Sequence, residues 1–287
     1  MDKIIAIFGD VHGHQDAMVQ AALRWQEQHQ ASIDLILCVG DFQAMRDETD
    51  MRAMACPAKY QQMGDYPAYH TGEKSFPAEM LFIGGNHEAY NWLETIPAGG
   101  CLSPLCYYLG RWGVVERLGL RMAGLTGNYS PRAYESGRRP VDYASPAVLT
   151  NERARKQSTY FTQTEVDALA KSGPVDVLLL HDWPAGLPEL AAPGTTDGTP
   201  RRGVGNPHAR RLLEQIKPRW LFCGHMHQYF RGEIRWSANA STRFVCLGRV
   251  TGPASQALCV LRIGDEGGLH PRIEEISSSP QDADFLA

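Results

Sequence analysis

Five short polar motifs in this chain carry side chains of the types that bind divalent metal ions. They supply two carboxylates, one amide and four imidazoles, from Asp10, His12, Asp41, Asn86, His181, His225 and His227. Nitrogen and oxygen donors without thiolates favour manganese, iron or zinc over softer metals. This set suffices for two adjacent metal ions. Of the three candidate metals we favour manganese. A further histidine, His87, directly follows Asn86 and is left for catalysis. The pattern predicts a two-metal hydrolase of phosphate esters.

Each of these motifs follows an apolar run that predicts a β-strand. Several runs are continuous and rich in β-branched residues, which is typical of strands buried on both faces. The predicted strands are 4–8, 35–39, 80–83, 175–180, 220–223, 243–247 and 258–263. Ligands in layered α/β folds gather beyond the carboxyl ends of strands, so we expect the polar motifs to meet there. Glycines at the turns, including Gly40, Gly85 and Gly224, permit sharp bends.

Helices and a hairpin complete the predicted architecture. Helical patterns cover 16–30, 164–171 and 207–216, and Asn206 is a suitable cap for the last of these. Pro207 fits the first turn of that helix. The segment 107–126 predicts a β-hairpin with Gly119 near its turn. These elements favour an α/β fold with two sheets packed together and helices outside, rather than one doubly wound sheet.

Composition sets limits on the class of protein. The 287 residues are 43% hydrophobic, which suffices for a packed core. A net charge of -4 gives no global signal for nucleic-acid binding, although bound metal ions would add local positive charge. Seven cysteines without short paired spacing indicate reduced thiols. The chain starts directly with a predicted strand, and no run reaches the ~18–20 apolar residues of a membrane span. We therefore expect a cytoplasmic protein without membrane association or an obligate protein partner.

We expect one domain over 1–276 and a flexible polar tail over 277–287. Two stretches within the domain, 43–78 and 128–159, lack clear periodicity. Long ordered loops inside a compact domain are usually functional. The second stretch combines several arginines with tyrosines, and by charge pattern alone a solvated surface loop is an equal alternative.

Taken together, the motifs resemble the calcineurin-like metallophosphoesterases over nearly the entire chain. The resemblance implies a four-layer α/β/β/α sandwich of two mixed sheets flanked by helices. It also implies how the ligands divide between two metal ions. One ion would be bound by Asp10, His12, Asp41 and His227, and the other by Asp41, Asn86, His181 and His225. Asp41 would bridge the two, because a carboxylate has two oxygens.

The implied role of His87 is to protonate the leaving oxygen or to stabilise charge on the phosphoryl group. The alternative is a histidine that only packs near the site. Either Glu88 or Asp50 is a candidate carboxylate for orienting its ring.

Within that superfamily the chain is most similar to RNA lariat debranching enzymes. Four stretches carry the similarity: 40–46, 54–60, 81–89 and 181–184. The segment from about 127 to 160 lies where that family has its recognition loop, and Tyr134 and Gly137 fit its pattern. The implied reaction is hydrolysis of 2′,5′-phosphodiester bonds in branched RNA. The candidate substrate contacts are Arg46, Arg132, Tyr134, Arg153 and Arg155.

Three departures from that family favour a bacterial-type relative. Asp10 stands where the family has Cys, and Gly224 stands where it often has Ala. The chain also ends soon after the catalytic region, whereas the eukaryotic enzymes continue. The substrate is then a branched RNA, or another phosphodiester or phosphomonoester.

Other phosphatases and a non-catalytic protein are the alternatives. Phosphoprotein phosphatases carry arginines beside the motifs that correspond to Asp41 and Asn86, and these are missing here; substitution by Arg46 or by the arginines of the long loop is the alternative. A nucleotide phosphatase would use the same ligands. A silent scaffold, such as the retromer subunit that shares this fold, is disfavoured because all seven ligand types and His87 are present.

Overall fold

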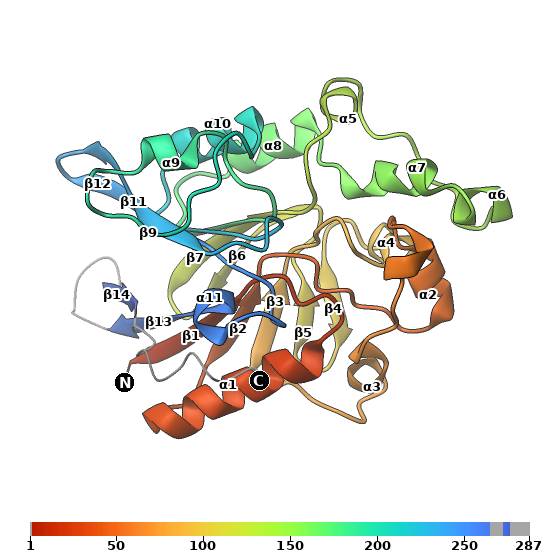
Figure 1. Cartoon of the computed structure of the whole chain (residues 1–287), viewed down its shortest axis with the longest axis horizontal. Helices are drawn as coiled ribbons and strands as arrows, with labels where there is room; N and C mark the ends of the chain where they lie inside the picture. The colour runs from red at the N-terminus through yellow and green to blue at the C-terminus, as the bar shows by residue number, and fades with distance from the viewer. Residues whose placement is uncertain (1, 265–271, 276–287) are drawn as a thin grey trace.

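Two seven-stranded mixed sheets pack face to face in the computed structural model, which describes residues 2–264 and 272–275 (Figure 1). The order of the first sheet is β14-β13-β1-β2-β3-β5-β4. Its strands are β1 (Lys3–Phe8), β2 (Leu35–Cys38), β3 (Glu79–Phe82), β4 (Gly100–Ser103), β5 (Cys106–Tyr108), β13 (Leu258–Gly264) and β14 (Arg272–Glu275). The four central strands β1, β2, β3 and β5 run parallel, so their carboxyl ends lie along one edge.

The second sheet has the order β6-β7-β8-β10-β12-β11-β9. Its strands are β6 (Trp112–Arg117), β7 (Leu120–Leu125), β8 (Val177–Leu180), β9 (Asp197–Gly198), β10 (Trp220–Cys223), β11 (Phe230–Ser237) and β12 (Ala240–Cys246). The predicted hairpin is confirmed, because β6 and β7 pair antiparallel with Arg117 opposite Leu120. Leu118 and Gly119 form its turn with φ of 55° and 75°, as a two-residue primed turn requires.

Three separate apolar cores confirm the predicted four-layer α/β/β/α sandwich. Along β1, Ile5 and Ile7 face the second sheet, whereas Ala6 and Phe8 face helix α1 (Gln15–His29). This alternation follows from the two-residue period of a strand. A third core lies between the second sheet and the helices α8 (Gln163–Ala170), α9 (Leu187–Leu190) and α10 (Pro207–Ile216). Figure 1 shows α1 outside one sheet and α8 to α10 outside the other.

The three predicted helices are confirmed within a residue of their ends. Helix α10 has the predicted bounds, and the side chain of Asn206 accepts hydrogen bonds from the main-chain N–H groups of His208 and Ala209. Thr162 and Glu165 form a reciprocal capping box at the start of α8. No helix in the described residues is long and apolar enough to cross a membrane.

The two stretches without periodicity contain short helices. The first holds α2 (Glu48–Ala53), a 3₁₀ turn (Ala58–Tyr60) and α3 (Tyr66–His70). The second holds α5 (Pro131–Ser136), α6 (Pro146–Leu149), α7 (Glu152–Arg155) and a 3₁₀ turn (Lys156–Thr159). Two more short helices are α4 (Tyr90–Leu93) and α11 (Ala254–Ala257). The predicted tail 277–287 lies outside the described residues, and the single domain over 1–276 stays a prediction.

Candidate metal centre

Both sheets contribute to one polar cluster at the carboxyl ends of their parallel strands. Asp10 follows β1, Asp41 follows β2 and Asn86 follows β3, which are neighbours in the first sheet. His181 and His225 follow β8 and β10, which are neighbours in the second sheet. The Nδ1 atom of His181 lies 3.0 Å from the carbonyl oxygen of Val39, and this hydrogen bond joins the two sheets.

Four of the predicted ligands converge on one point. The ligand atoms of Asp10, His12, Asp41 and His227 all lie within 4.8 Å of one another. His227 Nε2 lies 2.8 Å from His12 Nε2 and 3.0 Å from Asp10 Oδ2. Both carboxylates are fully buried, whereas His227 reaches the surface. Two carboxylates and two imidazoles at this spacing fit a divalent cation of the manganese, iron or zinc type.

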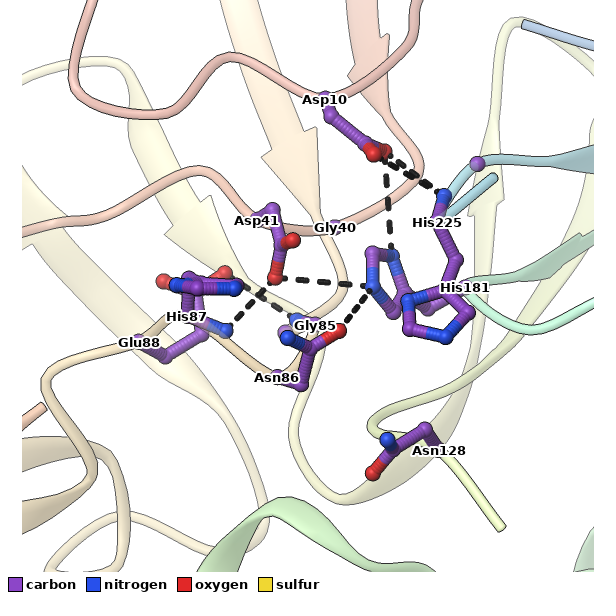
Figure 2. Close-up of polar contacts among 12 residues, drawn as sticks. Asp10, Gly40, Asp41, Gly85, Asn86, His87, Glu88, Asn128, His181 and His225 are labelled. Carbon is purple, nitrogen blue, oxygen red and sulfur yellow. Dashed lines mark hydrogen bonds and ion pairs between the residues drawn. The ribbon is translucent and has the colours of Figure 1, made fainter. Parts of the chain in front are cut away.

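The remaining predicted ligands lie on the other side of Asp41. His181 Nε2 lies 3.1 Å from Asn86 Oδ1 and 3.5 Å from Asp41 Oδ1, as Figure 2 shows. The centroids of the His225 and His181 rings lie 4.9 Å apart. Because Nδ1 of His181 bonds to a main-chain carbonyl group, its Nε2 is left to act as a ligand. Asp41 thus presents Oδ1 to His181 and Oδ2 to His12. The distance from Asp41 Oδ2 to His12 Nε2 is 3.7 Å.

Charge and burial set the protonation of these groups. Burial raises the pKa of Asp41, but His181, His87 and His12 more than offset it and hold the pKa below its usual value. Burial lowers the pKa of His12, and burial with the charge of His181 lowers that of His225. These two imidazoles therefore stay neutral near pH 7 and keep a lone pair for a cation.

The two histidines closest to Asp10 shift in the opposite direction. The hydrogen bond from His227 to Asp10 raises the pKa of His227. Burial disfavours the charged form of His181, but Asp41 and Asp10 outweigh burial and raise its pKa. Binding of a cation at either histidine would therefore release a proton.

The ligand loops have an unusual backbone conformation. His12, Asp41, His225 and His227 all have positive φ, between 47° and 68°, in the left-handed region that non-glycine residues rarely occupy. Such strain clusters at functional sites and persists where the surroundings fix it. Here the main-chain N–H of His12 donates to the carbonyl oxygen of Asp41 at 2.7 Å. The N–H of His225 donates to the carboxylate of Asp10 at 3.0 Å.

His87 lies against the cluster, as its position in the sequence suggested. Its main-chain N–H donates to Asp41 Oδ1 at 2.7 Å, as drawn in Figure 2. Its ring packs edge-on against that of His12, with the ring centroids 5.3 Å apart. The backbone of His87 is thus fixed through a predicted metal ligand, while its side chain is half-buried beside the cluster.

Both carboxylates considered as partners of the His87 ring bind other groups. Glu88 is fully buried and accepts main-chain hydrogen bonds from Phe42, Gln43 and Gly85. Burial and the charge of Asp41 raise the pKa of Glu88 to about 8. Asp50 accepts two side-chain hydrogen bonds from Arg46 and a third from Asn91. In the described structure both carboxylates therefore hold the loops in place.

The five candidate substrate contacts have different environments. Arg46 is paired with Asp50, and its guanidinium lies 4.2 Å from the centre of the Trp92 ring. Tyr134 is buried and stacks on His208, with 3.5 Å between ring centroids. Arg155 is also buried and donates to three main-chain carbonyl groups. Arg132 and Arg153 are exposed. A contact between any of these residues and a substrate stays a prediction.

Sequence reasoning missed residues that hold the ligands in place. Trp183 is fully buried, and its Nε1 donates to the carbonyl oxygen of Gly224 at 2.8 Å, which fixes the loop that carries His225 and His227. Gln43 Nε2 lies 3.2 Å from His12 Nδ1. The signal was present for Trp183, because a tryptophan two residues beyond a predicted ligand indicates a packed turn.

Two packed sheets with a cluster of metal-binding residue types at their edge are typical of a metallophosphoesterase, and comparison with known proteins points to the same class. The family model for calcineurin-like phosphoesterases matches residues 4–229. The chain belongs to the calcineurin-like phosphoesterase family, which confirms the resemblance noted in the sequence.

Among curated proteins the chain is similar to lariat debranching enzymes. It is 31% identical over 286 residues to that of Danio rerio, covering 94% of this chain and 49% of that protein. It is 35% identical over 235 residues to that of Gallus gallus, covering 79% of this chain and 43% of that protein. It is 32% identical over 274 residues to that of Arabidopsis thaliana, covering 92% and 64%. The chain thus spans about half the length of the curated relatives it matches.

Proposed function

We propose that this chain is a metal-dependent phosphoesterase that hydrolyses phosphodiester bonds with two divalent cations, manganese being favoured. The observation that carries this proposal is the position of Asp41. Its Oδ2 faces His12 and its Oδ1 faces His181, so one buried carboxylate joins two groups of nitrogen and oxygen donors. A carboxylate in that position suits the bridging ligand of a two-metal site.

The donors divide into two groups around Asp41. One ion would be held by Asp10, His12, Asp41 and His227, and the other by Asp41, Asn86, His181 and His225. The bound ions would supply an acidified water and positive charge for the phosphate oxygens.

His87 is the residue available for proton transfer. Its backbone is fixed through Asp41 Oδ1, and its ring lies against His12. A protonated imidazole in that position can donate its proton to the leaving oxygen as the ester bond breaks. We assign this role to His87.

We further propose that the substrates are 2′,5′-phosphodiesters in branched RNA. The similarity to lariat debranching enzymes supports this, and so does the segment between Asn128 and Phe161. Its base is closed by two main-chain hydrogen bonds, from Asn128 to Thr159 and from Phe161 to Asn128. The exposed Arg132 and Arg153 lie in this anchored segment and suit backbone phosphates.

The test is hydrolysis by the manganese-loaded protein of a synthetic branched RNA. Its linear 3′,5′ isomer and p-nitrophenyl phosphate are the controls. Selective cleavage of the 2′,5′ bond would support both parts of the proposal. Turnover of p-nitrophenyl phosphate without branch selectivity would leave a general phosphoesterase and refute the RNA assignment. No hydrolysis of any of the three by metal-loaded protein would refute the enzymatic role.

A further inference from the structure

A surface pocket of about 320 Å³ lies directly beside the metal ligand His227. Three segments that are distant in sequence form its walls. Thr199 directly follows β9, Gln228 follows His227 in the loop after β10, and Gln256 comes from α11. The volume is at the small end of the ~300–1,000 Å³ typical of ligand pockets, which suits one ring system rather than an extended ligand.

The walls of this pocket are fixed by main-chain contacts. The N–H of Thr199 donates to the carbonyl oxygen of Tyr229 at 3.2 Å, and a Cβ on Gly198 would lie only 2.5 Å from the same oxygen. β9 can therefore approach β11 this closely only with glycine at 198. On the opposite side, the N–H of Gly248 donates to the carbonyl oxygen of Gln256 at 2.7 Å.

Three of the polar side chains that line the pocket are available to a ligand. Within the described residues, the side chains of Thr199, Gln228 and Gln256 form no hydrogen bonds. Each glutamine amide offers two donors and one acceptor oxygen, and the threonine hydroxyl can do either. Mixed donors and acceptors match the edge of a nucleobase, which also presents both, better than they match an anion or an apolar group.

A cation lies on the same side of the metal centre. Arg249 is exposed, and its guanidinium has no hydrogen bond or ion pair with any described residue. Its backbone is held beside the site because the N–H of Val250 donates to the carbonyl oxygen of Asp10 at 2.8 Å.

We propose that this pocket is a nucleotide subsite, in which Thr199, Gln228 and Gln256 bind one base and Arg249 binds an adjoining phosphate. The proposal rests on the proposed function, since it makes the base next to the scissile phosphate a determinant of substrate choice. It places that determinant at the His227 side of the centre, on residues outside the 127–160 segment.

The test is binding of adenosine to the full chain loaded with zinc, which is diamagnetic, measured by saturation-transfer difference NMR. Adenosine has no phosphate ester, so the result does not depend on hydrolysis. We expect saturation of the base protons and about tenfold tighter binding than that of ribose. Gln256→Ala and Gln228→Ala should each weaken adenosine binding by about three- to tenfold, as the loss of a hydrogen bond predicts. Gln20→Ala, on an exposed position of α1, is the matched control.

Kinetics with branched RNA give a second measurement. Gln256→Ala should raise KM by about three- to tenfold while kcat falls by less, and Arg249→Gln should raise KM and reduce its dependence on salt. Equal binding of adenosine and ribose, or adenosine binding unaffected by both glutamine substitutions, would refute the subsite even if branched RNA is cleaved. Base-selective binding without hydrolysis would support the subsite and count against the proposed function instead.

Discussion

Replacing Gly85 with alanine would place a methyl group against Asp41 and His181, two of the predicted metal ligands. A Cβ at this position overlaps Oδ1 and N of Asp41 and lies 2.6 Å from Cε1 of His181. Since carbon atoms in contact lie ~3.5 Å apart, the ring of His181 or the loop at Gly85 must move by about 0.9 Å. Metal–ligand distances tolerate changes of only about 0.2 Å. The shift is therefore several times larger than the site can absorb.

We expect Gly85→Ala to lower the affinity for manganese by at least about 100-fold, since even a change in groups that only support ligands costs about 10–100-fold. Overpacking should cost about 1–3 kcal/mol of the free energy of unfolding, which lowers Tm of the metal-free protein by about 2–5 °C. Titration calorimetry with MnCl₂ measures the affinity, and scanning calorimetry measures Tm.

The matched control is Gly100→Ala in β4, because a Cβ there meets nothing within 4 Å and the φ of Gly100 is not positive. This variant should bind manganese like the wild type. If Gly85→Ala also binds manganese with wild-type affinity, then Asp41 and His181 are not the ligands that the cluster requires, and the assignment of the site is wrong.

Three further predictions test catalysis, packing and electrostatics. His87→Ala should lower kcat of the manganese-loaded protein by about 10²–10⁴-fold with unchanged metal content, and a loss of only a few-fold would contradict a role in proton transfer. Arg155→Ala removes buried hydrogen bonds to three carbonyl groups and should cost about 2–4 kcal/mol in urea unfolding, whereas the exposed Arg153→Ala should cost less than about 0.5 kcal/mol. Burial raises the pKa of Glu165, but nearby arginines, Arg111 foremost, more than offset it and lower the pKa. The interactions that lower the pKa of Glu165 stabilise the folded state. Their contribution is fully present above the unfolded pKa of about 4.3 and is lost as pH falls through the lower folded pKa. Glu165→Gln should therefore be less stable than wild type at pH 7, and urea unfolding should show the difference shrinking below about pH 4.

The central strands could be predicted from sequence because burial on both faces leaves continuous apolar runs. β10 has the predicted bounds for this reason. β11 was missed because only two of its eight residues, Phe230 and Ile234, are buried, so it lacks the continuous apolar run of the central strands. β9 has two residues and is defined only by pairing with β11, so no local pattern could reveal it. The helices of three to six residues in 43–78 and 128–159 are too short to establish a 3.6-residue period.

The sequence predicted which residue types form the candidate site. It was less informative about which partners their side chains contact. The candidate ligands could be proposed because their motifs follow strands whose ends are predictable. The environments of charged side chains were not, since they depend on partners far along the chain. Arg155 lies in an apparently basic loop, yet its Nε donates to the carbonyl oxygen of Met54, 101 residues away. Glu88 was a candidate partner for His87, yet its carboxylate bonds to the backbone at Phe42. A charge pattern alone does not distinguish a buried structural ion from one that faces solvent.

The left-handed residues explain why the ligand loops depend on one another. Each such residue costs of order 1–3 kcal/mol, and four of them are predicted ligands: His12, Asp41, His225 and His227. Hydrogen bonds between the loops help to hold these conformations, from His12 to the Asp41 carbonyl and from His225 to the Asp10 carboxylate. The apolar core between the sheets fixes the strands from which these loops start. A substitution that loosens any one loop should therefore disturb ligands on the others, and metal affinity should be a more sensitive reporter of such damage than global stability.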